Sequence, residues 1–329
     1  MSDAGSGPAP GRPKPDDAPR GQARSDWGAR YPASLLFTVC VLVWSTTWYA
    51  ITFQIGDSTP EFGVALRFML AGTCVLAWRA ARGERLTFPP RAHAWFALQG
   101  LFLYGVSYIC VYHAERYLPS GVVAVGYSAS PLAGGIGAAW LFGSPLTRRF
   151  LLGGVLGLAG VALIFWPEFG KARTGGNTSL GAVFTVGSVL LSTVGSLLAS
   201  RNGARGLTMW PSLGFGMLYG GAAVLLIALA SGQSLVWPTA PSWWAALLYL
   251  ALAGSVLSFA CYLTLLERLG AGPAGTIGVM TPILALVVST LFENYRPDLL
   301  AGAGVLLAVI GNVLILRKAP LRVASRAAE

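Results

Sequence analysis

The chain has 329 residues, of which 54% are hydrophobic and only 11% are charged, and its formal net charge is +10. A soluble domain carries about 25% charged residues. The composition therefore excludes a soluble multidomain enzyme, a disulfide scaffold, a coiled coil and a disordered chain, and it favours a polytopic α-helical membrane protein.

The first 32 residues differ from the rest of the chain. They contain six prolines and five basic residues but few apolar ones, so they cannot bury a core. This pattern is not that of a signal peptide. We expect a disordered cytoplasmic tail over residues 1–32 and a basic cytoplasmic tail over residues 318–329.

From residue 33 onward, apolar runs alternate with short polar breaks. The runs are about 20 residues long, which is the length that a hydrocarbon core of about 30 Å requires. The pattern predicts an all-α membrane protein with ten transmembrane helices, and the short connections predict that neighbouring helices pack antiparallel. The ten spans cover approximately residues 33–55, 61–79, 94–115, 119–142, 150–167, 179–200, 209–231, 243–266, 272–293 and 298–317.

The distribution of basic residues predicts the orientation. With a cytoplasmic N-terminus, 18 Lys and Arg residues fall in inner segments and 4 in outer segments, while Arg67 lies within a span. Because cytoplasmic loops carry the excess of basic residues, we expect both termini inside. The positive charge then reflects membrane orientation rather than nucleic-acid binding.

The two halves of the chain resemble each other, although low complexity favours chance matches between apolar, glycine-rich helices. From Leu118 to Ile164 the match runs without a gap at an offset of 151 residues. Each half has five spans, so the second copy enters the membrane the opposite way round. This predicts two inverted five-helix repeats, over residues 33–170 and 171–317, with the substrate site near the midplane between them. The matched pairs include Ser45/Ser192, Thr46/Thr193, Pro60/Pro211, Pro131/Pro282, Gly153/Gly304 and Gly160/Gly311.

Several short motifs occur in the same order as in a known family. Trp44-Ser45 lies in the middle of span one, Pro60 precedes Ala65-Leu66-Arg67-Phe68 in span two, and prolines interrupt spans four and nine. Over residues 33–317 this layout resembles the EamA type of the drug/metabolite transporter superfamily. The resemblance implies export of small metabolites or drugs.

The chain departs from that family pattern at two positions. The family often carries Gly after the span-one Trp and Glu at the end of span four, where this chain has Ser45 and Phe142. Span nine keeps its Glu, Glu293. Any interaction of the first-half Glu is therefore absent.

Tyr104, Tyr108 and Tyr112 recur every four residues in span three and so share one helix face. In lipid, polar side chains need a partner in the protein or a water-filled cavity. We expect the tyrosine stripe to face a central cavity, where the rings stack on an apolar substrate. The alternative is that the hydroxyl groups bond neighbouring helices. Candidates that extend the lining on span four are Tyr127, Ser128 and Ser130.

Trp44 and Trp48 share a face of span one. The indole N–H of a mid-membrane Trp needs an acceptor, so cavity lining and core packing are the two alternatives. The neighbouring hydroxyl groups either contact substrate or bond backbone carbonyls across closely packed helices. These hydroxyl candidates, with their counterparts in the second half, are Ser45, Thr46, Ser192, Thr193 and Thr281.

Arg67 lies about seven residues into span two, roughly 10 Å below its outer end at 1.5 Å per residue. A guanidinium group there is costly unless it is paired. It is either an anchor for a carboxylate or phosphate, or a structural residue that snorkels outward or caps a helix C-terminus.

Pro131 and Pro282 each free a backbone carbonyl at matched positions, which indicates hinges beside the substrate site or, alternatively, simple kinks.

None of the 13 acidic residues lies in the middle of a predicted span. Glu115 and Glu267 stand at span ends beside Arg116 and Arg268, which predicts interfacial ion pairs. Proton antiport usually needs an intramembrane carboxylate or histidine, and none is evident here. Facilitated export and coupling through Glu115 and His113 therefore stay open as alternatives.

The sequence lacks a phosphate-binding glycine loop, a metal-ligand cluster and a nucleophile triad, so we expect no enzymatic activity, no cofactor and no metal. The pattern favours a secondary transporter in a bacterial inner membrane that exports small amphipathic metabolites, such as amino acids or drugs, by alternating access. Its expected partners are a small-molecule substrate and the lipid bilayer, but no nucleic acid, and we expect a monomer with a dimer as the alternative. A membrane-embedded lipid-modifying enzyme and a channel-like subunit are the alternative functions.

Overall fold

The computed structural model describes residues 30–143, 145–172, 177–269 and 276–316, with residues 167–172, 266 and 267 described by their backbone only. In this part of the chain every regular element is a helix. Nine of these helices are long and apolar enough to cross a membrane. A shorter apolar helix, α14 (Ile277–Phe292), lies within the predicted ninth span, 272–293.

Six of the membrane-spanning helices are single, uninterrupted elements. They are α2 (Ala33–Thr52), α3 (Pro60–Ala81), α8 (Arg148–Ala172), α9 (Thr178–Ala204), α10 (Met209–Ala230) and α15 (Leu299–Leu316).

The other three spans are interrupted helices. The first combines α4 (Pro90–Gly100), η2 (Leu101–Val106) and α5 (Ser107–Glu115), the second combines α6 (Ser120–Gly126), η3 (Tyr127–Ala129) and α7 (Ser130–Phe142), and the third combines α11 (Pro241–Leu248), η4 (Tyr249–Leu257) and α12 (Ser258–Leu269). Here η2 and η4 are π-helical, whereas η3 is a 3₁₀ turn directly before Ser130 and Pro131. The first and third of these spans thus carry a π-helical stretch at a comparable depth, and such stretches are frequent at functional sites.

Local sequence explains where several helices begin and end. Thr59 caps α3 because its Oγ1 accepts a hydrogen bond from the backbone N–H of Phe62 at 3.3 Å. Pro60 follows as the first helical residue, a position where its missing N–H costs nothing. Helix α7 ends at Gly143, whose φ of 68° is left-handed and therefore suits a residue without a Cβ atom.

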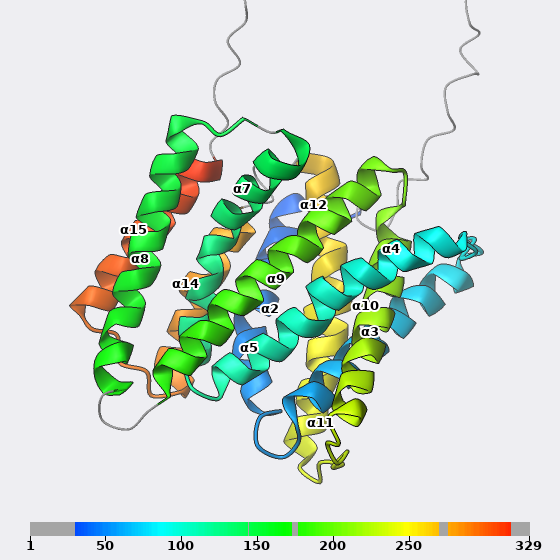
Figure 1. Ribbon diagram of the computed structural model, residues 1–329, viewed down its shortest axis with the longest axis horizontal. Coiled ribbons are helices and arrows are strands. Elements are labelled where there is room, and N and C mark those ends of the chain that lie inside the picture. The colour runs from blue at the N-terminus through cyan, green and yellow to red at the C-terminus, as the bar shows by residue number, and fades with distance from the viewer. Residues whose placement is uncertain (1–29, 144, 173–176, 270–275, 317–329) are drawn as a thin grey trace, which may run out of the picture.

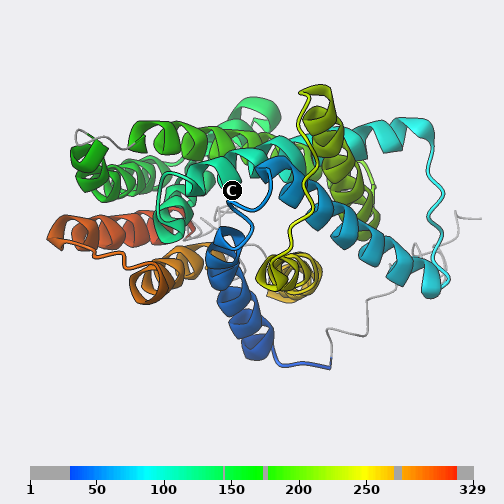
Figure 2. The ribbon, with the colours of Figure 1, turned by 90° about the horizontal axis from the view of Figure 1, so that it is seen from below.

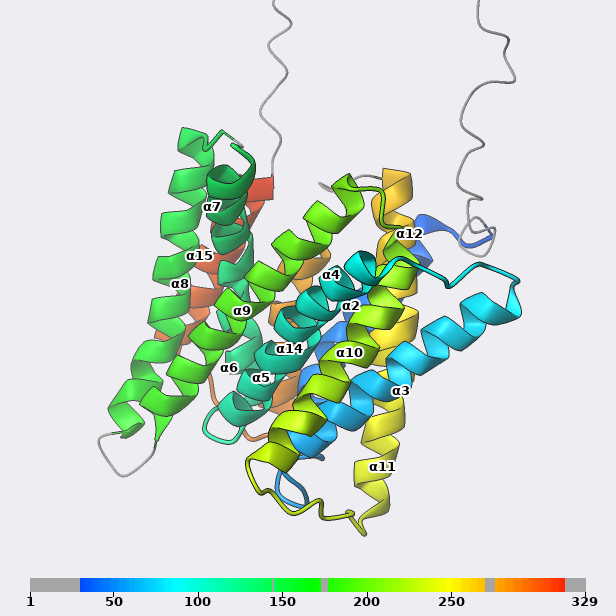
Figure 3. The same ribbon diagram turned by 45° about the vertical axis from the view of Figure 1, so that its right-hand side comes forward.

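The helices cross the molecule side by side, and α2 begins at the same face at which α15 ends (Figure 1). Seen from below, the green helices α8 and α9 lie in one layer, and α14 and α15, orange to red, lie in the next (Figure 2). Figure 3 shows α3 beside α10 and α8 beside α15, and both pairs are in contact, as are α6 and α14. Each of these pairs joins a helix that begins within residues 33–170 to one that begins within residues 171–317.

Glycines bring α8 and α15 into backbone contact. A Cβ atom added to Gly153 would lie 2.6 Å from the carbonyl oxygen of Gly311, and one added to Gly160 would lie 2.5 Å from that of Gly304. Gly153 and Gly304 are 151 residues apart, as are Gly160 and Gly311. Each contact therefore has a counterpart with the two partners exchanged, which is the pattern of an interface with two-fold symmetry.

Large apolar side chains also cover much of the outer surface. Trp140 is 85% exposed and Leu299 is 95% exposed. Such a surface suits acyl chains rather than water. The interior holds a buried cluster to which Phe68, Tyr104 and Tyr112 belong, and the candidate site lies there.

Candidate functional site

Arg67, on α3, is enclosed by protein and only 3% exposed. Its guanidinium group lies 5.0 Å from the ring centroid of Phe68 and 4.9 Å from that of Tyr108. Its Nε donates a long hydrogen bond of 3.5 Å to Ser255 Oγ on η4. Its Nη1 makes no hydrogen bond in the described part of the chain, although Tyr112 is close enough to interact with it electrostatically. Arg67 therefore does not snorkel to the surface. We call Arg67, Phe68, Tyr108, Tyr112 and Ser255 the Arg67 cluster.

The predicted tyrosine stripe overlaps this cluster, because Tyr108 and Tyr112 belong to both. Tyr104 packs against Phe68 at 5.4 Å between ring centroids, and Tyr108 packs against the same ring at 4.6 Å. Tyr112 donates a hydrogen bond of 2.7 Å to Gln54 Oε1, which matches the alternative role of bonding a neighbouring segment. The stripe thus lies between α3 and the segment after α2.

Polar contacts from span one converge on η4 and α14. Trp44 Nε1 donates to the carbonyl of Gly254 at 3.1 Å, which provides the acceptor that a mid-span indole requires. Thr46 Oγ1 and the Tyr249 hydroxyl lie 2.5 Å apart. Ser45 Oγ is 3.1 Å from the carbonyl oxygen of Thr281 on α14. The span-one candidates therefore hold the two halves together around the π-helical segment η4.

The remaining predicted residues have other contacts. Trp48 packs against Tyr127 at 5.1 Å between ring centroids. Ser192 and Thr193 both bond the carbonyl of Val189 in their own helix, at 3.0 Å and 2.7 Å. Ser128 and Pro282 are buried and Pro131 is half-buried, while Ser130 Oγ and Thr281 Oγ1 are buried without a hydrogen-bond partner in the described residues.

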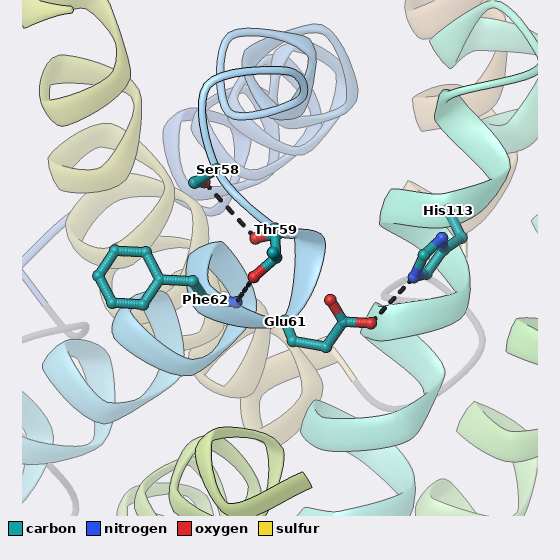
Figure 4. A network of polar contacts seen from close by, with 5 residues as sticks. All are labelled: Ser58, Thr59, Glu61, Phe62 and His113. Carbon is teal, nitrogen blue, oxygen red and sulfur yellow. Dashed lines mark hydrogen bonds and ion pairs between the residues drawn. The ribbon is translucent and has the colours of Figure 1, made fainter. Parts of the chain in front are cut away.

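Two polar residues that the sequence did not single out as a pair meet at one end of the bundle. Glu61, in the first turn of α3, lies 3.0 Å from Nε2 of His113 on α5. Figure 4 shows the two side chains pointing toward each other beside the Thr59 cap. They are 52 residues apart in sequence, so no local pattern predicts the contact.

The predicted ion pair between Glu115 and Arg116 is wrong. Glu115 is only 8% exposed, and neither carboxylate oxygen has a hydrogen-bond partner in the described residues. Arg116 instead lies on the surface. The side chain of Glu267 falls outside the described residues, while Arg268 donates to the carbonyl of Tyr31 at 2.8 Å.

Glu293, unlike Glu115, has several hydrogen-bond partners. It follows α14 and accepts hydrogen bonds from the backbone N–H of Ser120 at 3.3 Å and from Ser120 Oγ at 2.7 Å. Ser289 Oγ also bonds Glu293, and it accepts from the backbone N–H of Gly121 at 2.7 Å. These contacts join the start of α6 to the end of α14.

A large groove of about 1290 Å³ lies between α7, α8 and α9. Its walls are mostly apolar, and Thr193 is the predicted site residue among them. Its charged lining residues are Arg201 and Arg205, and the Arg201 guanidinium stacks over the ring of Trp95 at 3.3 Å. The groove can therefore hold an apolar body beside an anionic group.

Comparison with known proteins identifies the family to which this architecture belongs. The profile of the EamA-like transporter family matches residues 32–166 and 179–317. The inner membrane transporter YedA of Escherichia coli is 27% identical over 256 residues, covering 76% of this chain and 79% of that protein. A transporter of Synechocystis is 26% identical over 329 residues, covering 93% and 96% respectively.

A solved crystal structure has the same fold. It aligns with a TM-score of 0.62 and 23% sequence identity over 86% of this chain and 95% of that chain. The family and the relatives that are named as transporters point to a transporter rather than an enzyme. The chain belongs to the EamA-like transporter family, in the drug/metabolite transporter superfamily, and is a multi-pass transporter of the cell membrane.

Proposed function

We propose that the protein is a secondary transporter that exports small amphipathic metabolites, such as amino acids or drugs, by alternating access. The observation that carries this proposal is the groove between α7, α8 and α9, in which apolar walls accompany Arg201 and Arg205. A guanidinium group pairs well with a carboxylate or phosphate. We therefore expect substrates with an apolar body and an anionic or zwitterionic head.

Export is supported by the placement of the groove relative to the charge pattern. Arg201 and Arg205 belong to the segments that the basic-residue bias assigns to the cytoplasm. The Glu61–His113 pair and the Glu293 contacts lie at the span ends that the same bias assigns to the outside. There they join neighbouring helices and close the bundle. A groove that admits substrate from the inside and a closed outer end suit an exporter in its inward-facing state.

Alternating access is supported by the reciprocal contacts of the α8–α15 glycines, which fit two inverted five-helix halves over residues 33–170 and 171–317. In such transporters one half rocks against the other around a central site. Pro131, at the start of α7, and Pro282, inside α14, are the proposed hinges. Arg67, whose Nη1 makes no hydrogen bond in the described residues, is the proposed central anchor for the anionic head.

Transport by purified protein in liposomes tests this function. Radiolabelled phenylalanine, uridine and the cationic dye ethidium would be measured in parallel with protein-free liposomes. We expect phenylalanine to move fastest, and the double variant Arg201→Gln/Arg205→Gln to slow it by about 10- to 150-fold, because the loss of a charge-assisted contact costs about 1.5–3 kcal/mol. Arg116→Gln, which removes a surface arginine outside the groove, is the matched control. Movement of none of the three compounds above the protein-free level would contradict the proposal.

A further inference from the structure

Glu115 is a buried carboxyl group that the transport site described above does not use. It ends α5, and both of its oxygens are buried without a hydrogen-bond partner in the described residues. An ionised carboxylate without water, donor or counter-ion in contact costs several kcal/mol in a medium of low dielectric constant, and the group avoids that cost by holding a proton.

The charged groups near Glu115 come from two other elements. Glu293, after α14, and Arg67, on α3, both interact with it electrostatically, and Tyr112, one turn earlier on α5, does so as well. Of the other helices packed against α5, α2 and α6 contain no charged residue and α9 carries only Arg201, near its far end. Glu61 and His113 bond each other.

Glu115 and Glu293 form an unequal pair of carboxyl groups. Glu293 accepts hydrogen bonds from Ser120 and Ser289, and such donors stabilise the ionised form. Glu115 receives none in the described part of the chain, and a second negative charge nearby disfavours its ionisation further. The surroundings of Glu115 therefore favour the form that holds a proton.

We propose that Glu115 is the proton-binding group of this transporter, holding a proton while the outer end of the bundle is closed and releasing it when that end opens. This rests on the proposed transport function. The contacts of Ser120 and Gly121 with Ser289 and Glu293 close the outer end five residues beyond Glu115. Breaking them admits water, in which a glutamic acid ionises at neutral pH. The Glu115 O–H bond then breaks and the proton passes to water, so that closing the outer end again requires a proton from outside.

Infrared spectroscopy tests the proton site without any substrate. The purified protein in lipid should show a C=O stretching band of a protonated carboxyl group at neutral pH, and that band should be lost in Glu115→Gln. It should persist in Glu84→Gln, the matched control, since Glu84 pairs with Arg79 in a loop region. A band that is absent from the wild type, or unchanged in Glu115→Gln, would overturn the assignment.

A transport experiment tests whether closing the outer end requires this proton. With phenylalanine as the probe, raising the outside pH by one unit should slow net export by up to about tenfold, because the concentration of the protons that Glu115 takes up falls tenfold. Glu115→Gln, which cannot ionise, should lose this dependence on the outside pH but keep exchange of labelled for unlabelled phenylalanine. Wild-type export that does not respond to the outside pH would contradict the proton requirement and leave the transport function standing. If phenylalanine is not moved at all, that function fails, and the infrared band still decides whether Glu115 binds a proton.

Discussion

Aromatic rings, rather than a salt-bridged carboxylate, lie against the buried arginine in the described part of the chain. The Arg67 guanidinium lies over the rings of Phe68 and Tyr108, and cation–π contacts of this kind contribute about 0.5–2 kcal/mol, with the larger values at desolvated sites. The two rings therefore offset part of the cost of placing a cation among helices. Nη1 makes no hydrogen bond in the described residues, so the buried guanidinium group keeps an unused donor.

Two substitutions at Tyr108 separate the role of its ring from that of its hydroxyl group. Tyr108→Phe keeps the ring over Arg67 and should leave the thermal unfolding midpoint unchanged. Tyr108→Leu removes the ring and should lower stability by about 1–2 kcal/mol, measured as a lower midpoint in the same detergent. Equal midpoints for the two variants would show that the cation–π contact does not stabilise the protein.

Residue-level prediction from the sequence succeeded where a residue's needs are local and failed where they depend on distant partners. The indole of Trp44 was expected to need an acceptor, and it has one in Gly254. Glu115 was misassigned because it precedes Arg116, whereas adjacent residues on a helix do not face each other. Gln54 stands at a span end, where a polar residue is ordinary, so its bond to Tyr112 has no sequence signal.

At the scale of the helices, glycine spacing decides how closely α8 and α15 approach. Gly160 faces the backbone of Gly304 and Ala308, whereas a Cβ atom added to Gly157 on the same helix would meet nothing within 4 Å. The close contact of the two backbones maximises their van der Waals packing, which is the main attraction between helices in lipid.

This contrast gives a matched pair of substitutions. Gly160→Ala should destabilise the protein by about 1–3 kcal/mol, because backbone atoms cannot move aside as side chains do. Gly157→Ala should be neutral or stabilise it by up to about 1 kcal/mol through helix propensity. Thermal unfolding of both variants in the same detergent would check this, and a lower midpoint for Gly157→Ala than for Gly160→Ala would contradict it.

Hydropathy predicted the positions of the helices well, because a membrane span must be apolar along its whole length. The starts of α2 and α9 agree with the prediction to within one residue. The π-helical segments η2 and η4 were not predicted, since an extra residue within a helical turn leaves the apolar pattern intact. Helix α8 extends to Ala172, beyond the expected end at residue 167, because a helix can continue past the apolar stretch that marks it.

For the molecule as a whole, the sequence predicts an orientation but not the helix pairing. Helix α3 packs against α10, and α8 packs against α15. These pairings depend on how well the surfaces of helices that are far apart in sequence fit each other, which a count of basic residues cannot reveal. The orientation itself can be measured at the two ends of α3.

Single cysteines at exposed positions on either side of α3 report the orientation. Asp57→Cys should react with a membrane-impermeant maleimide in intact cells, whereas Arg82→Cys should react only after permeabilisation, because the basic-residue bias places it inside. Both positions are exposed, while the native cysteines are buried or half-buried and serve as the background. The reverse labelling pattern would place both termini outside.

The π-helical segment η2 has a mechanical consequence for everything that follows it in its span. A π turn closes its hydrogen bonds over one residue more than an α turn does, and each residue of an α-helix turns the chain by about 100° and advances it by 1.5 Å. Conversion of η2 to α-helical geometry would therefore rotate α5 about its own axis and shift it along that axis. Tyr108, Tyr112 and Glu115 would leave Arg67 together, as one rigid face, without any bending of the span.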